Sequence, residues 1–206
     1  MKIAFCIPGR EFTGWFLENW TELTQTLTSS PYIENLDSVI DWKLFRNYHP
    51  IINKARTEVL RRAKLWEPDY YMWIDSDINF KTTDFFKLLS SDKQIVSGLY
   101  HLQPPGGRFT QSYVPVTYAC HKNSREMLYT SDNDLNSNQP IEVYANGMGW
   151  MLVRKEVFEN IENPFDQTYS EQSEDIIFQV KAREKGYKSY VIPDVILGHE
   201  KMLIVK

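Results

Sequence analysis

Two aspartates stand where the sequence predicts the end of a buried strand. Asp75, Ser76 and Asp77 follow directly on the apolar run Tyr70–Ile74, which is typical of a strand buried on both faces. Ligands of open α/β sheets bind beyond the carboxyl ends of strands. Residues two apart on an extended chain point to the same side, so both carboxylates are expected to face one cavity.

A cation would relieve the repulsion between two such carboxylates. Hard oxygen ligands suit Mg²⁺ or Mn²⁺, and these ions also bridge phosphate oxygens. The alternative is that both residues are loop acids that cap the next turn, because an Asp-x-Asp triplet often occurs by chance. The position after a buried strand favours a cation site at Asp75 and Asp77.

Charged residues at the starts of two predicted helices form a second group. Arg56 falls in the first turn of a helix predicted over 53–66, where a cation opposes the helix dipole unless an anion lies nearby. A nucleotide diphosphate would supply that anion, and a solvated surface arginine is the alternative. Glu174 and Asp175 follow Ser173, and a serine cap with acids in the first turn would by itself explain all three residues.

The elements that carry these residues alternate regularly. Strands are predicted at 3–7, 36–45, 70–74, 94–100 and 188–192, and helices at 13–27, 53–66, 83–89, 155–161 and 173–185. The rhythm of the first hundred residues indicates an α/β protein with a mostly parallel sheet and helices on both faces. Residues 101–138 are rich in Pro, Gly, Ser, Asn and Asp, which indicates loops and hairpins. We find no internal repeat and no linker that would divide the chain.

Composition limits the classes of function. A net charge of −4 provides no electrostatic footprint for a nucleic-acid backbone, so no nucleic-acid partner is expected. Cys6 and Cys120 do not make a disulfide framework, which favours free thiols in a reducing compartment. No stretch approaches the roughly 20 apolar residues of a transmembrane segment, and the N-terminal apolar run is too short for a signal peptide. A soluble, cytoplasmic protein is therefore expected.

Four segments in a characteristic order resemble those of GT-A glycosyltransferases, especially the family-2-like group with its small stand-alone viral and bacterial members. Residues 53–56 match the Ala-Arg-containing start of a helix, and residues 69–78 match the strand and DxD motif. Residues 146–158 resemble the small-residue segment on the acceptor side, and residues 173–187 resemble the "ED" helix. Each motif alone is weak, whereas four in order are specific and span nearly the whole chain.

The resemblance implies a GT-A fold, which is Rossmann-like with a mostly parallel central sheet, helices on both faces and a small antiparallel hairpin region. It further implies one domain over residues 1–206. About residues 1–100 would bind the nucleotide sugar, and about residues 101–206 would bind the acceptor.

On the donor side, the resemblance assigns residues of the first loop, the helix start and the DxD triplet to the nucleotide sugar. These are Pro8, Gly9, Arg10, Asn53, Arg56, Asp75, Ser76 and Asp77. Metal binding is assigned to Asp77, Asp75 and His199. Asp77 is the expected direct ligand, Asp75 could instead meet the ribose or sugar or reach the metal through water, and His199 could equally be a surface residue of the tail.

On the acceptor side, the resemblance makes Asp175 the general base and Glu174 a residue that binds or orients the acceptor. The segment Gly147, Met148, Gly149 and Trp150 would contact the acceptor. Trp150 could stack on a sugar ring, and packing in the core is equally compatible with the sequence.

The predicted function is transfer of a sugar from a nucleoside-diphosphate sugar to a hydroxyl group of a glycan, glycoprotein or glycolipid. Mn²⁺ or Mg²⁺ is the expected cofactor, a UDP-sugar is the default donor with GDP-sugars open, and inversion is expected if Asp175 acts as base. A nucleotidyltransferase is the first alternative, but its glycine-rich basic loop is lacking after the first strand. A non-catalytic sugar-binding module on a degenerate GT-A fold is the second, and the intact Asp75, Asp77 and Asp175 argue against it.

Overall fold

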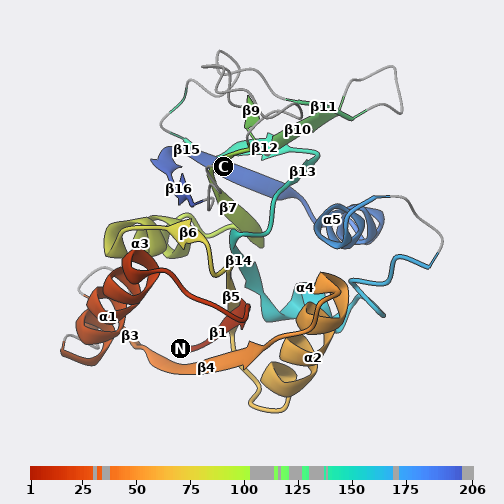
Figure 1. The fold of residues 1–206 in the computed structure, drawn as a ribbon. Helices are drawn as coiled ribbons and strands as arrows, with labels where there is room; N and C mark the ends of the chain where they lie inside the picture. Colours follow the sequence, from red (N-terminus) through yellow and green to blue (C-terminus); the bar gives the residue numbers. More distant parts are fainter. Residues whose placement is uncertain are drawn as a thin grey trace, which may run out of the picture.

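A computed structural model of the chain describes residues 1–29, 32–33, 38–102, 114–115, 117–120, 127–129, 137, 139–168 and 172–200. A seven-stranded sheet crosses the molecule in the order β12-β15-β7-β14-β5-β1-β4 (Figure 1). Its strands, in chain order, are β1 (Lys2–Pro8), β4 (Asp41–Asn47), β5 (Tyr70–Ile74), β7 (Ile95–Leu99), β12 (Ile141–Val143), β14 (Trp150–Arg154) and β15 (Ser189–Ile196).

The sheet is mostly parallel in the direction of its strands. β1 pairs in parallel with both β4 and β5, and β15 pairs in parallel with β7. β14 lies antiparallel between β5 and β7, and β12 is antiparallel to β15 at the edge. Five strands therefore run one way and two the other, so the predicted mixed α/β architecture is confirmed.

Five helices cover the two faces of the sheet. α1 (Gly14–Ser29) and α3 (Thr82–Ser90) lie on one face, and α2 (Ile52–Lys64), α4 (Lys155–Glu159) and α5 (Glu174–Glu184) lie on the other (Figure 1). β1 shows why both faces are filled, because its side chains alternate. Ile3, Phe5 and Ile7 pack with α1 and α3, whereas Ala4 and Cys6 pack with α2, α4 and α5.

Short strands surround the main sheet. β2 (Tyr32–Ile33) pairs with β3 (Ser38–Val39), β6 (Ile78–Asn79) with β16 (Gly198–His199), and β8 (His101–Leu102) with β9 (Val114–Pro115). β10 (Thr117–Cys120) joins β11 (Met127–Tyr129) and β13 (Ala145–Asn146) in a three-stranded antiparallel sheet. The predicted hairpins of residues 101–138 are borne out where the structure describes that region.

Several predicted boundaries were wrong. The strand predicted over 36–45 is two separate strands, β3 and β4, and β4 continues to Asn47. The last strand does not stop before Pro193 but runs to Ile196, with a register shift between Ile192 and Ile196 that accommodates the proline. A proline lacks the N–H that a regular ladder needs, and bulges are one place where strands tolerate it.

Cys6 is a free, buried thiol, as predicted. The side chain of Cys120 lies outside the described residues. Within the described part of the chain, no helix is both long and apolar enough to cross a membrane.

Candidate active site

The candidate site forms beyond the carboxyl end of β5, where the chain leaves the sheet in a tight turn. The Asp75 N–H donates to the Gly149 carbonyl at 2.9 Å, and the Ile78 N–H donates back to the Asp75 carbonyl at 3.2 Å. Ser76 and Asp77 form this turn. Gly9 of the first loop packs so tightly against it that an added Cβ would lie 2.6 Å from Ser76 Cβ. The DxD turn and the first loop are therefore in direct contact.

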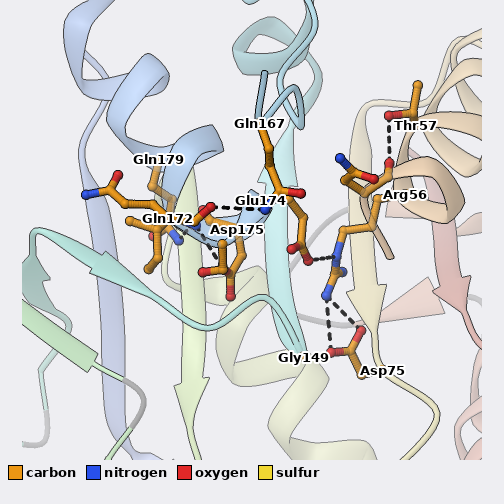
Figure 2. Close-up of polar contacts among 12 residues, drawn as sticks. Arg56, Thr57, Asp75, Gly149, Gln167, Gln172, Glu174, Asp175 and Gln179 are labelled. Atoms are coloured by element: carbon orange, nitrogen blue, oxygen red, sulfur yellow. Dashed lines mark hydrogen bonds and ion pairs between the residues drawn. The ribbon is translucent and has the colours of Figure 1, made fainter. Parts of the chain in front are cut away.

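Arg56 of α2 joins the end of β5 to the start of α5. Its Nη2 donates to both oxygens of Asp75 at 3.0 and 3.2 Å, and its Nε donates to Glu174 Oε1 at 2.9 Å. Figure 2 shows the guanidinium between the two carboxylates. The side chains of Arg56 and Glu174 are only 3% and 7% exposed. Arg56 Nη1 is also buried and has no hydrogen-bond partner among the described residues.

The anions that lie beside Arg56 belong to the protein. The arginine is the fifth residue of α2, just past the first turn, and the anions beside it are Asp75 and Glu174 of the protein itself. Carboxylates of the protein therefore already balance the charge of Arg56, and contact between Arg56 and a nucleotide diphosphate stays a prediction. The alternative of a solvated surface arginine is excluded by its burial.

Charge is unusually concentrated here. Burial by itself would lower the pKa of Arg56, but Asp75, Glu174 and Asp175 outweigh it and hold that pKa above its ordinary value. Burial raises the pKa of Asp75; Arg56 opposes this increase, whereas Asp77, Asp175 and Glu174 add to it. Three carboxyl groups, Asp75, Glu174 and Asp175, thus converge on one guanidinium.

Asp77 faces a different side chain from the one that Asp75 faces. Its Oδ2 lies 3.2 Å from His199 Nε2, while Asp75 faces Arg56. The alternation of an extended chain ends at Ile74, because residues 76–77 lie in a turn; that both carboxylates face one cavity stays a prediction. Asp77 is 38% exposed and His199 11% exposed, so this pair is accessible where the Arg56 cluster is closed.

The hydrogen bonds of His199 determine what its ring presents to Asp77. Nδ1 lies 3.2 Å from the His101 carbonyl oxygen. A carbonyl oxygen only accepts, so this bond places the proton of a neutral ring on Nδ1. Nε2 then carries a lone pair facing a carboxylate oxygen. Two acceptors at that distance repel each other unless a proton or a cation lies between them.

The C-terminal segment is held over the turn by several contacts. β16 pairs with β6 through Gly198↔Asn79 and His199↔Ile78. The Glu200 N–H donates to the Asp77 carbonyl at 2.8 Å, and Thr13 Oγ1 donates to Glu200 Oε1 at 3.0 Å. The sequence placed His199 in a tail; the structure makes it part of a small sheet with the residues that follow the DxD turn.

Asp175 sits at the first turn of α5 beside the Arg56 cluster (Figure 2). Its Oδ1 accepts a hydrogen bond from the Ile176 N–H at 2.8 Å and also from the Ser173 hydroxyl. Ser173 occupies the N-cap position but makes no side-chain cap to the helix. The explanation of Ser173 as a helix cap was therefore wrong, because its hydroxyl orients Asp175 instead.

The small-residue segment 147–150 lies inside the protein. Met148 and Trp150 have no exposed surface, and the Trp150 ring stacks on Phe80 with centroids 4.4 Å apart. The choice between sugar stacking and core packing for Trp150 is thus answered in favour of packing. Gly149 donates its N–H to the Tyr100 hydroxyl at 3.1 Å, and an added Cβ would lie 3.0 Å from that oxygen.

The remaining predicted donor residues surround the same region. Pro8 ends β1, and Gly9 donates its N–H to the Asn47 carbonyl at 3.0 Å. Arg10 is exposed and lies over the Tyr48 ring at 5.7 Å. Asn53 has a buried side-chain oxygen without a hydrogen-bond partner among the described residues. Gly9 of the first loop therefore contacts the DxD turn, and donor binding by Arg10 and Asn53 stays a prediction.

Sequence reasoning missed Tyr100, which packs its ring against His199 at 5.3 Å and accepts the Gly149 hydrogen bond. Its position at the carboxyl end of β7 was the available signal. It also missed Gln179 and Asn146, which are 1% exposed and bound to each other. Buried amides inside elements carry no motif, so only the structure could identify that pair.

Comparison with known proteins identifies the fold. No family model and no curated protein matches the sequence. Among solved structures, A197 from STIV is 16% identical, with 100% of this chain and 97% of that chain covered and a TM-score of 0.55. GalNAc-T7, solved with UDP, GalNAc and Mn²⁺, is 12% identical, with 98% of this chain and 44% of that chain covered and a TM-score of 0.59. S. aureus TarS is 14% identical, with 96% and 59% covered and a TM-score of 0.49.

The chain has the GT-A fold. The predicted fold class is confirmed, because the mixed sheet with helices on both faces matches A197 and GalNAc-T7 over nearly the whole chain. Membership of the family-2-like group stays a prediction. At this level of identity, the likeness concerns the fold and not the reaction.

Proposed function

We propose that the protein is a metal-dependent glycosyltransferase that takes a nucleoside-diphosphate sugar, with UDP as the nucleotide, as its donor. The observation that carries the proposal is the convergence of the accessible Asp77–His199 pair and Asp175 around the end of β5. In a GT-A fold this is the edge of the sheet where ligands bind. The fold likeness to GalNAc-T7, which was solved with UDP, GalNAc and Mn²⁺, supports UDP and Mn²⁺ over other choices.

Asp77 and His199 would hold the metal ion. Their facing atoms are 3.2 Å apart, and neighbouring ligands at about 2.1 Å from one octahedral ion are separated by about 3 Å. The bond from Nδ1 to the His101 carbonyl matches the backbone support usual for a metal-bound histidine. Within the described residues, no three His, Cys, Asp or Glu side chains cluster as a metal site. Two protein ligands nevertheless suit a cation that the donor's phosphates and water complete.

Mg²⁺ or Mn²⁺ bound there would supply positive charge for the leaving diphosphate. Arg56 and Asp75 would have separate roles in the donor site. Arg56 holds Asp75 and Glu174 in fixed positions and keeps that part of the site closed. Asp75, at the end of β5, is left to meet the ribose or sugar through its exposed edge, which is 28% of the side chain.

Asp175 would act as general base for the acceptor. The Ser173 hydroxyl and the Ile176 N–H both bind Oδ1, which leaves Oδ2 as the atom to take a proton from an acceptor hydroxyl. The acceptor oxygen would attack the anomeric carbon as the bond to the diphosphate breaks, which inverts that carbon. Glu174 is committed to Arg56, so we propose that it orients Asp175 and does not itself transfer a proton.

The donor would lie over residues 1–100 and the acceptor over residues 101–206. Gly147 and Gly149 are buried together with Met148 and Trp150, so we propose that this segment supports the acceptor side from within the protein and does not stack on the sugar. A glycan, glycoprotein or glycolipid hydroxyl is the proposed acceptor class.

A donor screen tests the proposal. Thermal unfolding is followed with UDP-glucose, UDP-galactose, UDP-GlcNAc, UDP-GalNAc and GDP-mannose, each with Mn²⁺ or with EDTA. A ligand that binds only the folded state raises the midpoint by mass action. We expect a Mn²⁺-dependent rise with UDP-sugars, followed by UDP release that Asp77→Ala and Asp175→Asn abolish. Turnover near wild type in both variants would refute the assignment, and binding without turnover would favour a non-catalytic module.

A further inference from the structure

A pair of buried amides connects α5 to the acceptor-side segment. Gln179 Oε1 accepts the Asn146 backbone N–H at 3.0 Å, and Gln179 Nε2 donates to the Asn146 carbonyl. The side chain thereby binds both backbone groups of one residue, as a neighbouring strand would. Both residues are 1% exposed. A buried amide with these bonds is costly to move, because each lost partner leaves a desolvated polar group unpaired.

The same side chain also reaches the candidate base. Gln179 Nε2 donates a second hydrogen bond to the backbone carbonyl of Asp175 at 3.0 Å. One turn of α5 therefore separates Asp175 from the residue that fixes its carbonyl (Figure 2). On its other side, Glu174 is bound to Arg56. The first turn of α5 is thus held at two points, toward β5 through Arg56 and toward β13 through Gln179.

Asn146, at the other end of this connection, is also held by hydrogen bonds of its side chain. The Asn146 side-chain amide donates to the Gly98 carbonyl at 3.0 Å and to the Ser97 hydroxyl. The Ser97 hydroxyl donates in turn to the Tyr190 carbonyl at 3.2 Å. Asn146 is therefore fixed to both β7 and β15, two central strands. The chain continues from it into Gly147–Gly149, and the Gly149 carbonyl accepts the Asp75 N–H.

We propose that Gln179 is a positioning residue that fixes Asp175 relative to the acceptor-side segment 146–149. The inference rests on the proposed function, in which Asp175 is the base. An acceptor hydroxyl must lie within hydrogen-bond reach of Asp175, and an error of about 1 Å in such a geometry can cost a hundredfold in rate. The Gln179 amide group contacts both the Asp175 backbone and the Asn146 backbone.

The test compares Gln179→Met with a matched control. Methionine has similar length but makes none of the amide's hydrogen bonds. Asp84→Asn is the control, because Asp84 is buried on α3 at the opposite face and its carboxylate accepts the Lys81 N–H. UDP release from the four UDP-sugars with Mn²⁺, with water as acceptor, is measured well below the unfolding midpoint of each variant.

We expect Gln179→Met to lower kcat tenfold or more with the donor KM within about twofold, while Asp84→Asn leaves both unchanged despite a lower midpoint. A kcat within twofold of wild type would overturn the inference, as would a fall that Asp84→Asn reproduces. If Gln179→Met does not fold, Gln179→Glu replaces it, because it keeps an acceptor for the Asn146 N–H and loses both N–H donors. We expect the same result, a lower kcat with a nearly unchanged donor KM.

Two further readouts separate this inference from the proposed function. If Asp175→Asn abolishes turnover and Gln179→Met does not, only the role of Gln179 fails; if Asp175→Asn turns over like wild type, the proposed function fails. Amide hydrogen exchange needs no turnover. In Gln179→Met we expect exchange to accelerate together at 146–149 and 175–177 and to stay unchanged in β1. Unchanged protection at 146–149 would overturn the inference.

Discussion

The two aspartates of the DxD turn occupy opposite environments although one residue separates them. Asp75 faces a guanidinium that is 3% exposed and shares it with Glu174, whereas Asp77 is 38% exposed and faces an imidazole. A closed cluster in which every carboxylate has a partner serves to hold elements together. An accessible carboxylate that faces an imidazole nitrogen offers two groups to which a cation could bind. The difference supports the proposal that Asp75 is held mainly by the protein and that Asp77 binds the metal ion.

Breaking the closed cluster should have the largest effect on stability. Arg56→Met leaves Asp75 and Glu174 without their cation, and removing one member of a buried ion pair costs about 3 to 5 kcal/mol. Urea unfolding followed by circular dichroism measures the loss. The control is Arg61→Met on the same helix, whose side chain is 62% exposed and pairs with Glu58. Equal losses for the two arginines would contradict the distinction between the clusters.

A smaller effect is expected where the first loop meets the DxD turn. Gly9→Ala would place a Cβ 2.6 Å from Ser76 Cβ, so one segment must shift, and such overpacking costs about 1 to 3 kcal/mol. Because Ser76 is next to Asp77, we also expect weaker Mn²⁺-dependent binding of UDP by calorimetry. Gly14→Ala is the control, since an added Cβ there meets nothing within 4 Å. Similar losses of binding in both variants would argue against the contact.

The smallest effect concerns the exposed ion pair between Arg61 and Glu58 on α2. The hydrogen bond from Arg61, aided by nearby positive charge, lowers the pKa of Glu58 from its ordinary value of 4.5. A lowered folded-state pKa adds stability above the unfolded-state pKa, and that stability is lost as the pH falls through the folded-state pKa. The small stability difference between wild type and Arg61→Met at pH 7 should therefore shrink as the pH is lowered below the unfolded-state pKa of Glu58. A difference that grows on acidification would contradict this sign.

The sequence allowed the local part of this account to be predicted. The strand at Tyr70–Ile74 has the predicted bounds, and the helix predicted over 53–66 is observed as Ile52–Lys64. Both depend on apolar periodicity and on residues close in the chain. The positions of Asp75 and Asp77 beyond a strand end followed from the same local pattern.

What could not be predicted depends on partners far apart in the sequence. Glu174 reaches Arg56 across 118 residues, and His199 reaches Asp77 across 122. No periodicity records such pairs, so the sequence could not identify Asp75 and Glu174 as the anions beside Arg56. The insertion of β14 between β5 and β7 is equally non-local, and it explains why Trp150 is buried against Phe80.

The proposed metal site at Asp77 and His199 is tested most directly by calorimetric titration of UDP. UDP is titrated into the wild-type protein and into Asp77→Ala, each with Mn²⁺ and with EDTA. Asp77→Ala removes a partly exposed side chain, so its unfolding free energy should stay within about 0.5 kcal/mol of wild type. We predict Mn²⁺-dependent binding of UDP to the wild type and none to the folded variant. Binding of equal strength with EDTA, or in Asp77→Ala, would contradict the assignment of a metal-assisted donor site to this turn.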